Sequence, residues 1–156
     1  MWWEIALAYA HLALILSLAV FQGSLAALLR PEWMNPAALA RLQRLVRINQ
    51  IATTLVLASG LLRLFLGQKS AAGYMANPMM HAKLTLVLLL IALAIPCYRA
   101  VAQWQKTYAA HATLPDAQAL KKARRWIMFS SHLMLLIPIF ALLIARGYSS
   151  FAALGA

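Results

Sequence analysis

Basic side chains inside long apolar stretches are the residues of this chain best suited to chemistry. His11, Arg63 and Lys83 each lie within such a stretch. With a rise of about 1.5 Å per residue, Arg63 and Lys83 lie about 6 Å below the outer end of their stretches, and His11 lies roughly 9 Å below the outer end of its own. The three groups are therefore expected at a similar depth below one membrane surface. A neutral imidazole can ligate iron, and ammonium and guanidinium groups pair with anions. These residue types predict a site for a metal-bearing or anionic ligand, with His11 as the metal ligand. The alternative for His11 is a hydrogen-bonded core histidine that binds no ligand.

Carboxylates to neutralise these groups are scarce. The chain has 14 Lys and Arg residues against three Asp and Glu residues, and Arg146 ends the last apolar stretch near the same surface. An uncompensated buried charge is costly, so we expect an anionic ligand to supply the missing charge. The candidates are the propionates of a haem or porphyrin, the head of a quinone, a lipid phosphate and a small carboxylate. The alternative is that Arg63 and Arg146 extend to lipid phosphates.

A second polar cluster is expected in the opposite half of the same stretches. Its main members are Gln22, Asn49 and His132, with Gln50, Ser130 and Ser131 at similar depths. Uncharged polar side chains in membranes most often hydrogen-bond helices to one another. The cluster therefore predicts helix contacts, or a second polar interior.

The elements that must position these residues are membrane-spanning helices. Apolar residues make up 64% of the chain, against roughly 45 to 50% in soluble domains. Four stretches are long enough to cross a bilayer: residues 5–29, 48–67, 79–100 and 126–146. None alternates like a membrane β-strand. We predict an all-α, antiparallel bundle of four transmembrane helices, formed by a single domain over residues 1–156. The lone Cys97 excludes a disulfide scaffold.

The basic residues predict how the bundle is oriented. Ten of the 14 lie in or beside the two loops that join spans one to two and three to four: Arg30, Arg41, Arg44, Arg47, Arg99, Lys106, Lys121, Lys122, Arg124 and Arg125. Cytoplasmic loops retain positive charge, so both termini should face outward from a bacterial inner membrane. The same residues predict contact with anionic lipids. No nucleic-acid-binding motif accompanies them, and we expect no nucleic-acid partner.

Local signals predict where helices begin and bend. Asn35 is a candidate cap for a helical extension over residues 36–47, and Asp116 suits the start of the helix that leads into span four. Gly60 permits close helix approach, while Pro96 and Pro138 can bend spans three and four. None of these three residues identifies a function.

Several segments resemble a family of small bacterial inner-membrane proteins known as domain of unknown function 2214. They are Leu28-Leu29-Arg30-Pro31, Ser59-Gly60-Leu61-Leu62-Arg63, Gly67-Gln68-Lys69-Ser70-Ala71-Ala72-Gly73-Tyr74, Asn77-Pro78 and His81-Ala82-Lys83-Leu84. The resemblance covers nearly the whole chain. It implies a four-helix membrane protein and brings no established activity.

His11 and the segment beginning His81-Ala82-Lys83-Leu84 are also distantly similar to the bacterial four-helix protoporphyrinogen oxidase family. That family is associated with haem b and has functional His and Lys residues in its first and third spans. The resemblance therefore implies roles for His11 and Lys83. The Trp and Leu-Pro-Arg motif that follow the family's first-span His are replaced here by Phe21-Gln22-Gly23-Ser24.

Three functions follow from these observations. In the leading hypothesis, the outer half of the bundle holds haem b or a related porphyrin, with His11 on the iron, Lys83 completing or polarising the site, and Arg63 and Arg146 on the propionates. The second is a quinone-coupled or porphyrinogen-oxidising membrane oxidoreductase that uses the same pocket. The third is a cofactor-free accessory subunit or lipid-binding protein. A homodimer or a larger membrane complex is compatible with all three.

Overall fold

The computed structural model describes residues 2–66 and 76–146, and the helices account for nearly all of them. The elements in chain order are α1 (Trp2–Leu28), the short 3₁₀ helix η1 (Pro31–Trp33), α2 (Pro36–Leu66), α4 (Pro78–His111), α5 (Ala117–Met134) and α6 (Ile137–Ala145). No strand occurs in these ranges. Four helical segments are long and apolar enough to cross a membrane, with α5 and α6 together forming the fourth. The predicted all-α four-helix membrane bundle is confirmed.

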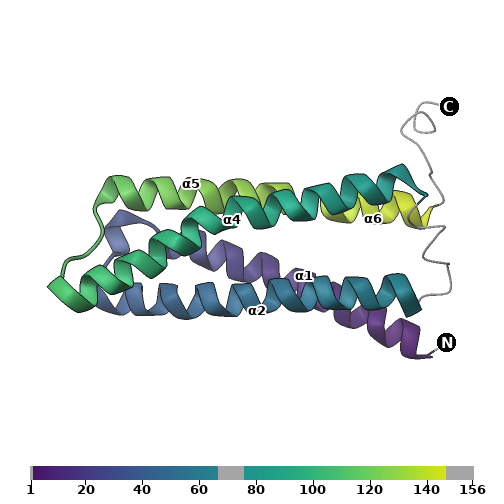
Figure 1. The fold of residues 1–156 in the computed structure, drawn as a ribbon, viewed down its shortest axis with the longest axis horizontal. Coiled ribbons are helices and arrows are strands. Elements are labelled where there is room, and N and C mark those ends of the chain that lie inside the picture. The colour runs from purple at the N-terminus through teal and green to yellow at the C-terminus, as the bar shows by residue number, and fades with distance from the viewer. Residues whose placement is uncertain (1, 67–75, 147–156) are drawn as a thin grey trace.

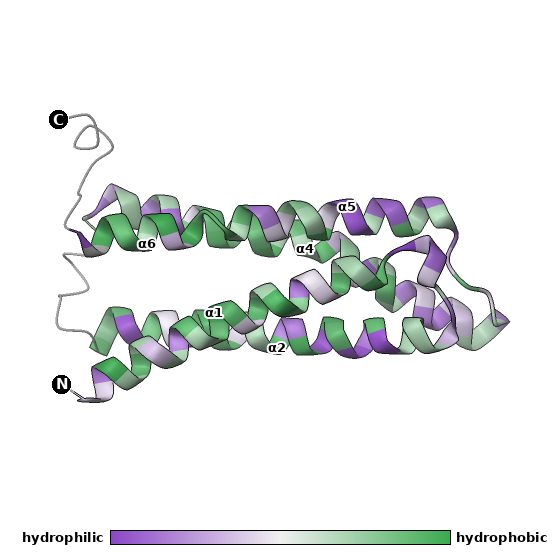
Figure 2. Ribbon diagram, turned by 180° about the vertical axis from the view of Figure 1, so that it is seen from behind, coloured by the Kyte–Doolittle hydropathy of each residue, from purple (hydrophilic) through white to green (hydrophobic). Residues whose placement is uncertain are grey.

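The helices lie lengthwise against one another (Figure 1). The N-terminal ends of α1 and α4 and the C-terminal ends of α2 and α6 meet at one end of the bundle, here called the terminal end. The opposite end, here called the basic end, carries η1 and the connection from α4 to α5. Figure 2 shows hydrophilic residues gathering toward the basic end of α2 and α5. Which end faces the cytoplasm stays a prediction from the charge distribution.

The capping side chains explain where the helices begin. The Asn35 Oδ1 accepts a hydrogen bond of 2.9 Å from the Ala38 amide, so the predicted extension over residues 36–47 is the first part of one continuous helix, α2. The Asp116 Oδ1 accepts one of 2.7 Å from the Ala119 amide, as predicted for the start of α5. Asn77 caps α4 in the same way by accepting from the Met79 amide. Each cap satisfies an amide that lacks a partner within its helix.

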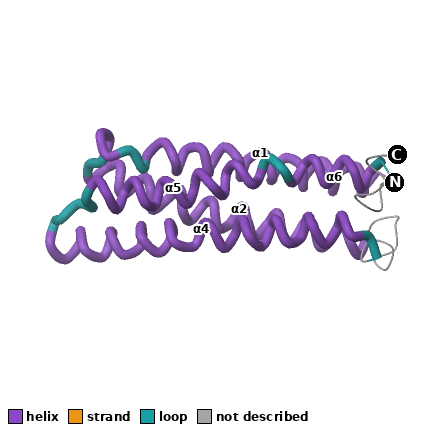
Figure 3. The backbone as a smooth tube through the Cα atoms, turned by 90° about the horizontal axis from the view of Figure 1, so that it is seen from above, coloured by secondary structure: helices purple, strands orange, loops and turns teal. Residues whose placement is uncertain are grey.

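The fourth span is broken, where a single helix over 126–146 was expected. Leu135 and Leu136 separate α5 from α6, and their amides bond to the carbonyls of His132 and Leu133, each at 3.1 Å. Pro138 lies at the start of α6, where its missing N–H is tolerated. The short loop is visible between the two helices in Figure 3. Pro96, in contrast, lies inside the continuous helix α4.

Packing is uneven along the bundle. The larger buried cluster joins α1, α2, α4 and α5 toward the basic end, through residues that include Leu25, Leu42, Cys97 and Ile127. A smaller cluster near the middle contains Leu18, Leu90 and Met134. Nearer the terminal end, the buried positions of α1 and α2 are the polar residues His11 and Ser59. The terminal half is therefore the part of the bundle that has room for a site.

Candidate functional site

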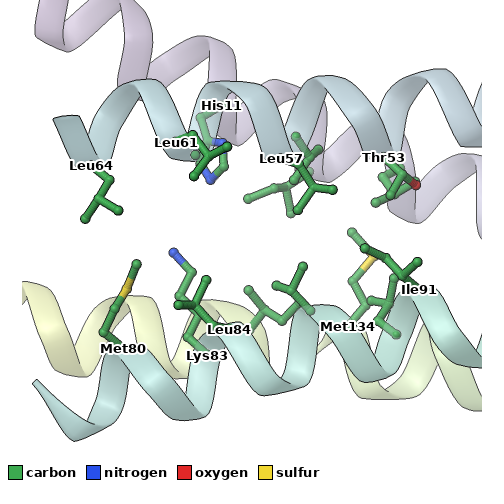
Figure 4. Close-up of a pocket in the computed structure, with 17 residues that line it drawn as sticks. His11, Thr53, Leu57, Leu61, Leu64, Met80, Lys83, Leu84, Ile91 and Met134 are labelled. Atoms are coloured by element: carbon green, nitrogen blue, oxygen red, sulfur yellow. The ribbon is translucent and has the colours of Figure 1, made fainter. Parts of the chain in front are cut away.

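A cavity of about 110 Å³ lies in the terminal half, between α1, α2, α4 and the junction of α5 with α6. Its walls are almost entirely apolar, and the polar side chains that line it are His11, Thr53 and Lys83. In Figure 4 the imidazole of His11 and the amine of Lys83 point into the space between α2 and α4 from opposite sides. The structure thus brings together the two residues that sequence reasoning placed first.

The His11 ring is hydrogen-bonded to α2. Its Nδ1 lies 2.7 Å from the Ser59 Oγ. When the Ser59 hydroxyl donates to the Val56 carbonyl, 3.1 Å away, its oxygen accepts from the Nδ1–H of His11. The neutral ring then carries its lone pair on Nε2. This is the arrangement of a metal-ligating histidine, whose other nitrogen donates to a fixed partner.

Gly60 makes room for the imidazole. A Cβ atom at this position would lie 3.3 Å from the His11 Cε1, whereas one at Gly23 would meet nothing within 4 Å. Gly60 therefore has a specific packing role: the His11 ring lies against the backbone of α2 where a side chain would otherwise stand.

This difference predicts opposite effects of two matched substitutions. Gly23→Ala should raise the free energy of unfolding by about 0.5 to 1 kcal/mol, because alanine favours a helix. Gly60→Ala should lower it, because the same gain is offset by an overpacking cost of roughly 1 to 3 kcal/mol against the ring. Thermal unfolding of both variants in detergent measures the difference. Equal stability of the two variants would contradict the role given to Gly60.

Lys83 is half-buried among apolar neighbours and makes no ion pair or hydrogen bond within residues 2–66 and 76–146. Its charge and that of Arg63 both act on His11. Arg63 is exposed and does not line the cavity, and Arg146, the C-cap of α6, is exposed as well. The site therefore has a core of His11 and Lys83, with Arg63 within electrostatic range and Arg146 farther out on the surface.

The second polar cluster divides into two hydrogen-bonded pairs. The Gln22 Nε2 donates to the Ser130 Oγ at 3.2 Å, and that hydroxyl donates to the Leu90 carbonyl at 3.1 Å. Asn49 bonds to the Tyr98 hydroxyl. Gln22 and Asn49 are fully buried, and each keeps a carbonyl oxygen without a donor among the described residues. His132 is exposed and bonds at 2.6 Å to the Met128 carbonyl of its own helix, apart from both pairs.

The two pairs lie at one level of the bundle. His11 of α1 meets Ser59 of α2, and these helices run antiparallel (Figure 1). Eleven residues further along α1 and ten residues back along α2 lead to Gln22 and Asn49, about 16 Å nearer the basic end. Polar side chains thus join the helices at two levels of the bundle, one at His11 and Ser59 and one at Gln22 and Asn49. This is expected where hydrogen bonds hold membrane helices together.

Sequence reasoning missed two partners, Ser59 and Tyr98. Ser59 follows Ala52 by seven residues and Asn49 by ten, so these three residues share the face that α2 buries. That spacing of small and polar residues was the available signal for Ser59. Nothing comparable marks Tyr98, which lies beside the charged Arg99 near the expected end of its span.

The family described as predicted membrane protein (DUF2214) matches residues 3–149. The chain belongs to this family. Membership agrees with the four membrane helices and extends over His11, Gly60 and Lys83. No curated protein and no solved structure matches the chain. The more distant resemblance to protoporphyrinogen oxidases therefore stays a prediction, and family membership itself supports an integral membrane protein.

Proposed function

We propose that this membrane protein binds haem b or a related porphyrin in the terminal half of its bundle. The observation that carries the proposal is the pair of nitrogen donors that face one another across an apolar space: the His11 Nε2 and the Lys83 Nζ. His11 and Lys83 would hold the iron of such a group, because both side chains offer a nitrogen ligand. The same proposal gives the protein a redox or tetrapyrrole-related role.

The chemistry of the donor set fits a porphyrin better than a bare metal ion. Among the described residues, no three His, Cys, Asp or Glu side chains gather to hold a metal. A porphyrin supplies four nitrogen ligands itself, so one histidine and one lysine are sufficient. The arginines suit its propionates: Arg63 lies near the pair, and Arg146 closes α6 at the same end of the bundle.

The cavity is too small to hold a porphyrin without movement of the helices that line it. About 110 Å³ is below the roughly 300 to 1,000 Å³ usual for ligand pockets, so α2 and α4 must separate around a macrocycle. Leu57, Leu61 and Leu84 line the cavity and are between 37% and 54% exposed. These side chains can turn outward into lipid, where leucine is at no disadvantage.

Each polar residue of the proposed site then has a defined role. Ser59 bonds to the Nδ1 of His11 and would leave its Nε2 free to ligate iron, and Gly60 leaves space for the ring. Lys83 ligates through a neutral amine, or polarises the bound group through a charged one. The apolar walls keep water from the site. Haem in such a setting supplies one-electron transfer.

A second candidate function is supported by the same two side chains. The Lys83 amine can donate to a quinone carbonyl, and the His11 Nε2 can accept from a quinol hydroxyl. The site would then belong to a quinone-coupled membrane oxidoreductase. A cofactor-free accessory subunit, in which Lys83 only meets lipid, is the third reading.

The absorption spectrum of the purified protein tests the proposal. We expect a Soret band after haem-replete expression, and a sharp α band after reduction with dithionite. A colourless preparation that stays colourless after addition of haem would overturn the porphyrin proposal. Quenching of tryptophan fluorescence by an added quinone in that colourless protein would support the second candidate.

Lys83 has its own expected result. In Lys83→Ala the haem should remain bound through His11, but its spectrum should change to that of high-spin iron, because a ligand is lost. Lys106→Ala is the matched control, since Lys106 is an exposed lysine of the same helix. An unchanged spectrum in Lys83→Ala would show that the lysine does not ligate iron.

A further inference from the structure

A second, larger cavity lies between the same two helices but nearer the basic end. Its volume is about 300 Å³, and it adjoins the first cavity at Thr53, Leu57, Leu90 and Ile91. Beyond these shared residues it extends to Gln50 and Tyr98. It contains neither His11 nor Lys83, and it shares four apolar or hydroxyl side chains with the proposed porphyrin site.

Two arginines, Arg47 of α2 and Arg99 of α4, follow the residues that line this cavity, here called the groove, toward the basic end, although neither lines it. On α2, Arg47, Gln50 and Leu57 are spaced by three and seven residues, and therefore share one face. On α4, Ile91, Ile95 and Arg99 are spaced by four. The helices run antiparallel, and Asn49 contacts Tyr98, so Arg47 and Arg99 lie at the same level.

These two arginines lack a counter-ion from their own helices. Both are exposed, and neither α2 nor α4 contains an acidic residue. Of the three carboxylates, Asp116 caps α5, Glu32 lies in η1, and Glu4 lies at the opposite end of the bundle in α1. The mouth of the groove is therefore strongly positive and attracts an anion.

The polar groups change along the groove in an order that matches one class of molecule. The guanidinium groups come first, at Arg47 and Arg99. The exposed side chain of Gln50 follows, and it makes no hydrogen bond within the described residues. The apolar walls at Leu57, Ile91 and Ile95 come last. A phospholipid has the same order: phosphate, ester carbonyls and acyl chain.

We propose that this groove binds an anionic phospholipid from the leaflet at the basic end. Its phosphate lies between Arg47 and Arg99, the Gln50 amide donates to an ester carbonyl, and one acyl chain lies between α2 and α4. Basic residues at a membrane surface attract anionic lipid, and here the groove selects one bound molecule from that population. The site needs no cofactor, so it stands whether or not the protein binds haem.

Native mass spectrometry of the detergent-purified protein tests this site, with phosphatidylglycerol and phosphatidylcholine as the added lipids. We expect one retained phosphatidylglycerol, and about fivefold weaker retention for each of Arg47→Gln and Arg99→Gln, the effect of one basic side chain at an anionic surface. Lys121→Gln and Lys122→Gln, on exposed positions of α5, remove the same charge away from the groove and should leave retention unchanged.

A groove variant separates bound lipid from diffuse attraction. Ile95→Trp places a large side chain in the groove at a position that is 39% exposed, so the protein should fold and lose the retained lipid. Circular dichroism checks its helix content. Equal losses in the Arg47 and Lys121 variants would overturn the proposal, as would undiminished retention in a folded Ile95→Trp protein.

Discussion

His11→Ala is expected to cause a large loss of haem affinity. His11 is 7% exposed, and its ring is held by the contact between its Nδ1 and the Ser59 Oγ, whereas Lys83 has no hydrogen bond within the described residues. Without the imidazole, the iron loses its oriented ligand and only Lys83 remains. We expect affinity to fall by about 100-fold or more, beyond the roughly 10- to 100-fold typical of losing an outer-shell partner. Titration of apoprotein with haem, followed at the Soret band, measures this loss.

Ser59→Ala should lie between wild type and His11→Ala. It removes the acceptor for the Nδ1–H and leaves the ring itself, so affinity should fall by roughly 10- to 100-fold. Ser131→Ala is the control, because the Ser131 hydroxyl donates only to the Ile127 carbonyl of its own helix. A Soret band of unchanged strength in His11→Ala would refute the ligand assignment, and full affinity in Ser59→Ala would refute the orienting hydrogen bond.

Leu25→Ala is expected to cause a large loss of stability. Leu25 is fully buried in the cluster that joins four helices near the basic end. Truncating a leucine in such a core costs roughly 2 to 5 kcal/mol, since the surrounding side chains cannot close the cavity. Leu16→Ala is the matched control on the same helix, because Leu16 is 59% exposed and packs mainly against lipid.

The reactivity of Cys97 measures the difference in stability between Leu25→Ala and Leu16→Ala. Cys97 is the only cysteine of the chain, it is fully buried, and it lies in the same cluster as Leu25. Its reaction with a thiol-specific fluorophore during a temperature ramp therefore reports opening of that core. The Leu25→Ala protein should react at a clearly lower temperature than Leu16→Ala. Coincident transitions would mean that this cluster does not limit unfolding.

The architecture was predictable because membrane helices are specified by quantities that a sequence displays directly. Length and hydropathy placed the four spans, and the side chains of Asn35 and Asp116 marked two helix starts that the structure confirms. The break in the fourth span was harder to foresee. Pro138 indicated a bend, but Pro96 has the same chemistry and lies within an unbroken helix.

The sequence predicted how deep each candidate residue lies in the membrane, but not the direction in which its side chain points. Counting residues at a known rise placed His11, Arg63 and Lys83 near one level. Which way each points depends on helix rotation, and spans that are apolar on all sides carry little amphipathic pattern to fix it. His11 and Lys83 therefore face the cavity while Arg63 and Arg146 are exposed, and His132 turns away from Gln22 and Asn49.

The interruption at Leu135 and Leu136 lies beside the smaller cavity. Met134 and Ile137, on either side of it, both line the smaller cavity. Pro138 cannot donate a hydrogen bond, and the Leu135 and Leu136 amides bond three residues back, so the fourth span is least regular at this joint. In the proposed function, movement of α6 at the joint would widen the smaller cavity at Met134 and Ile137, in addition to the separation of α2 and α4.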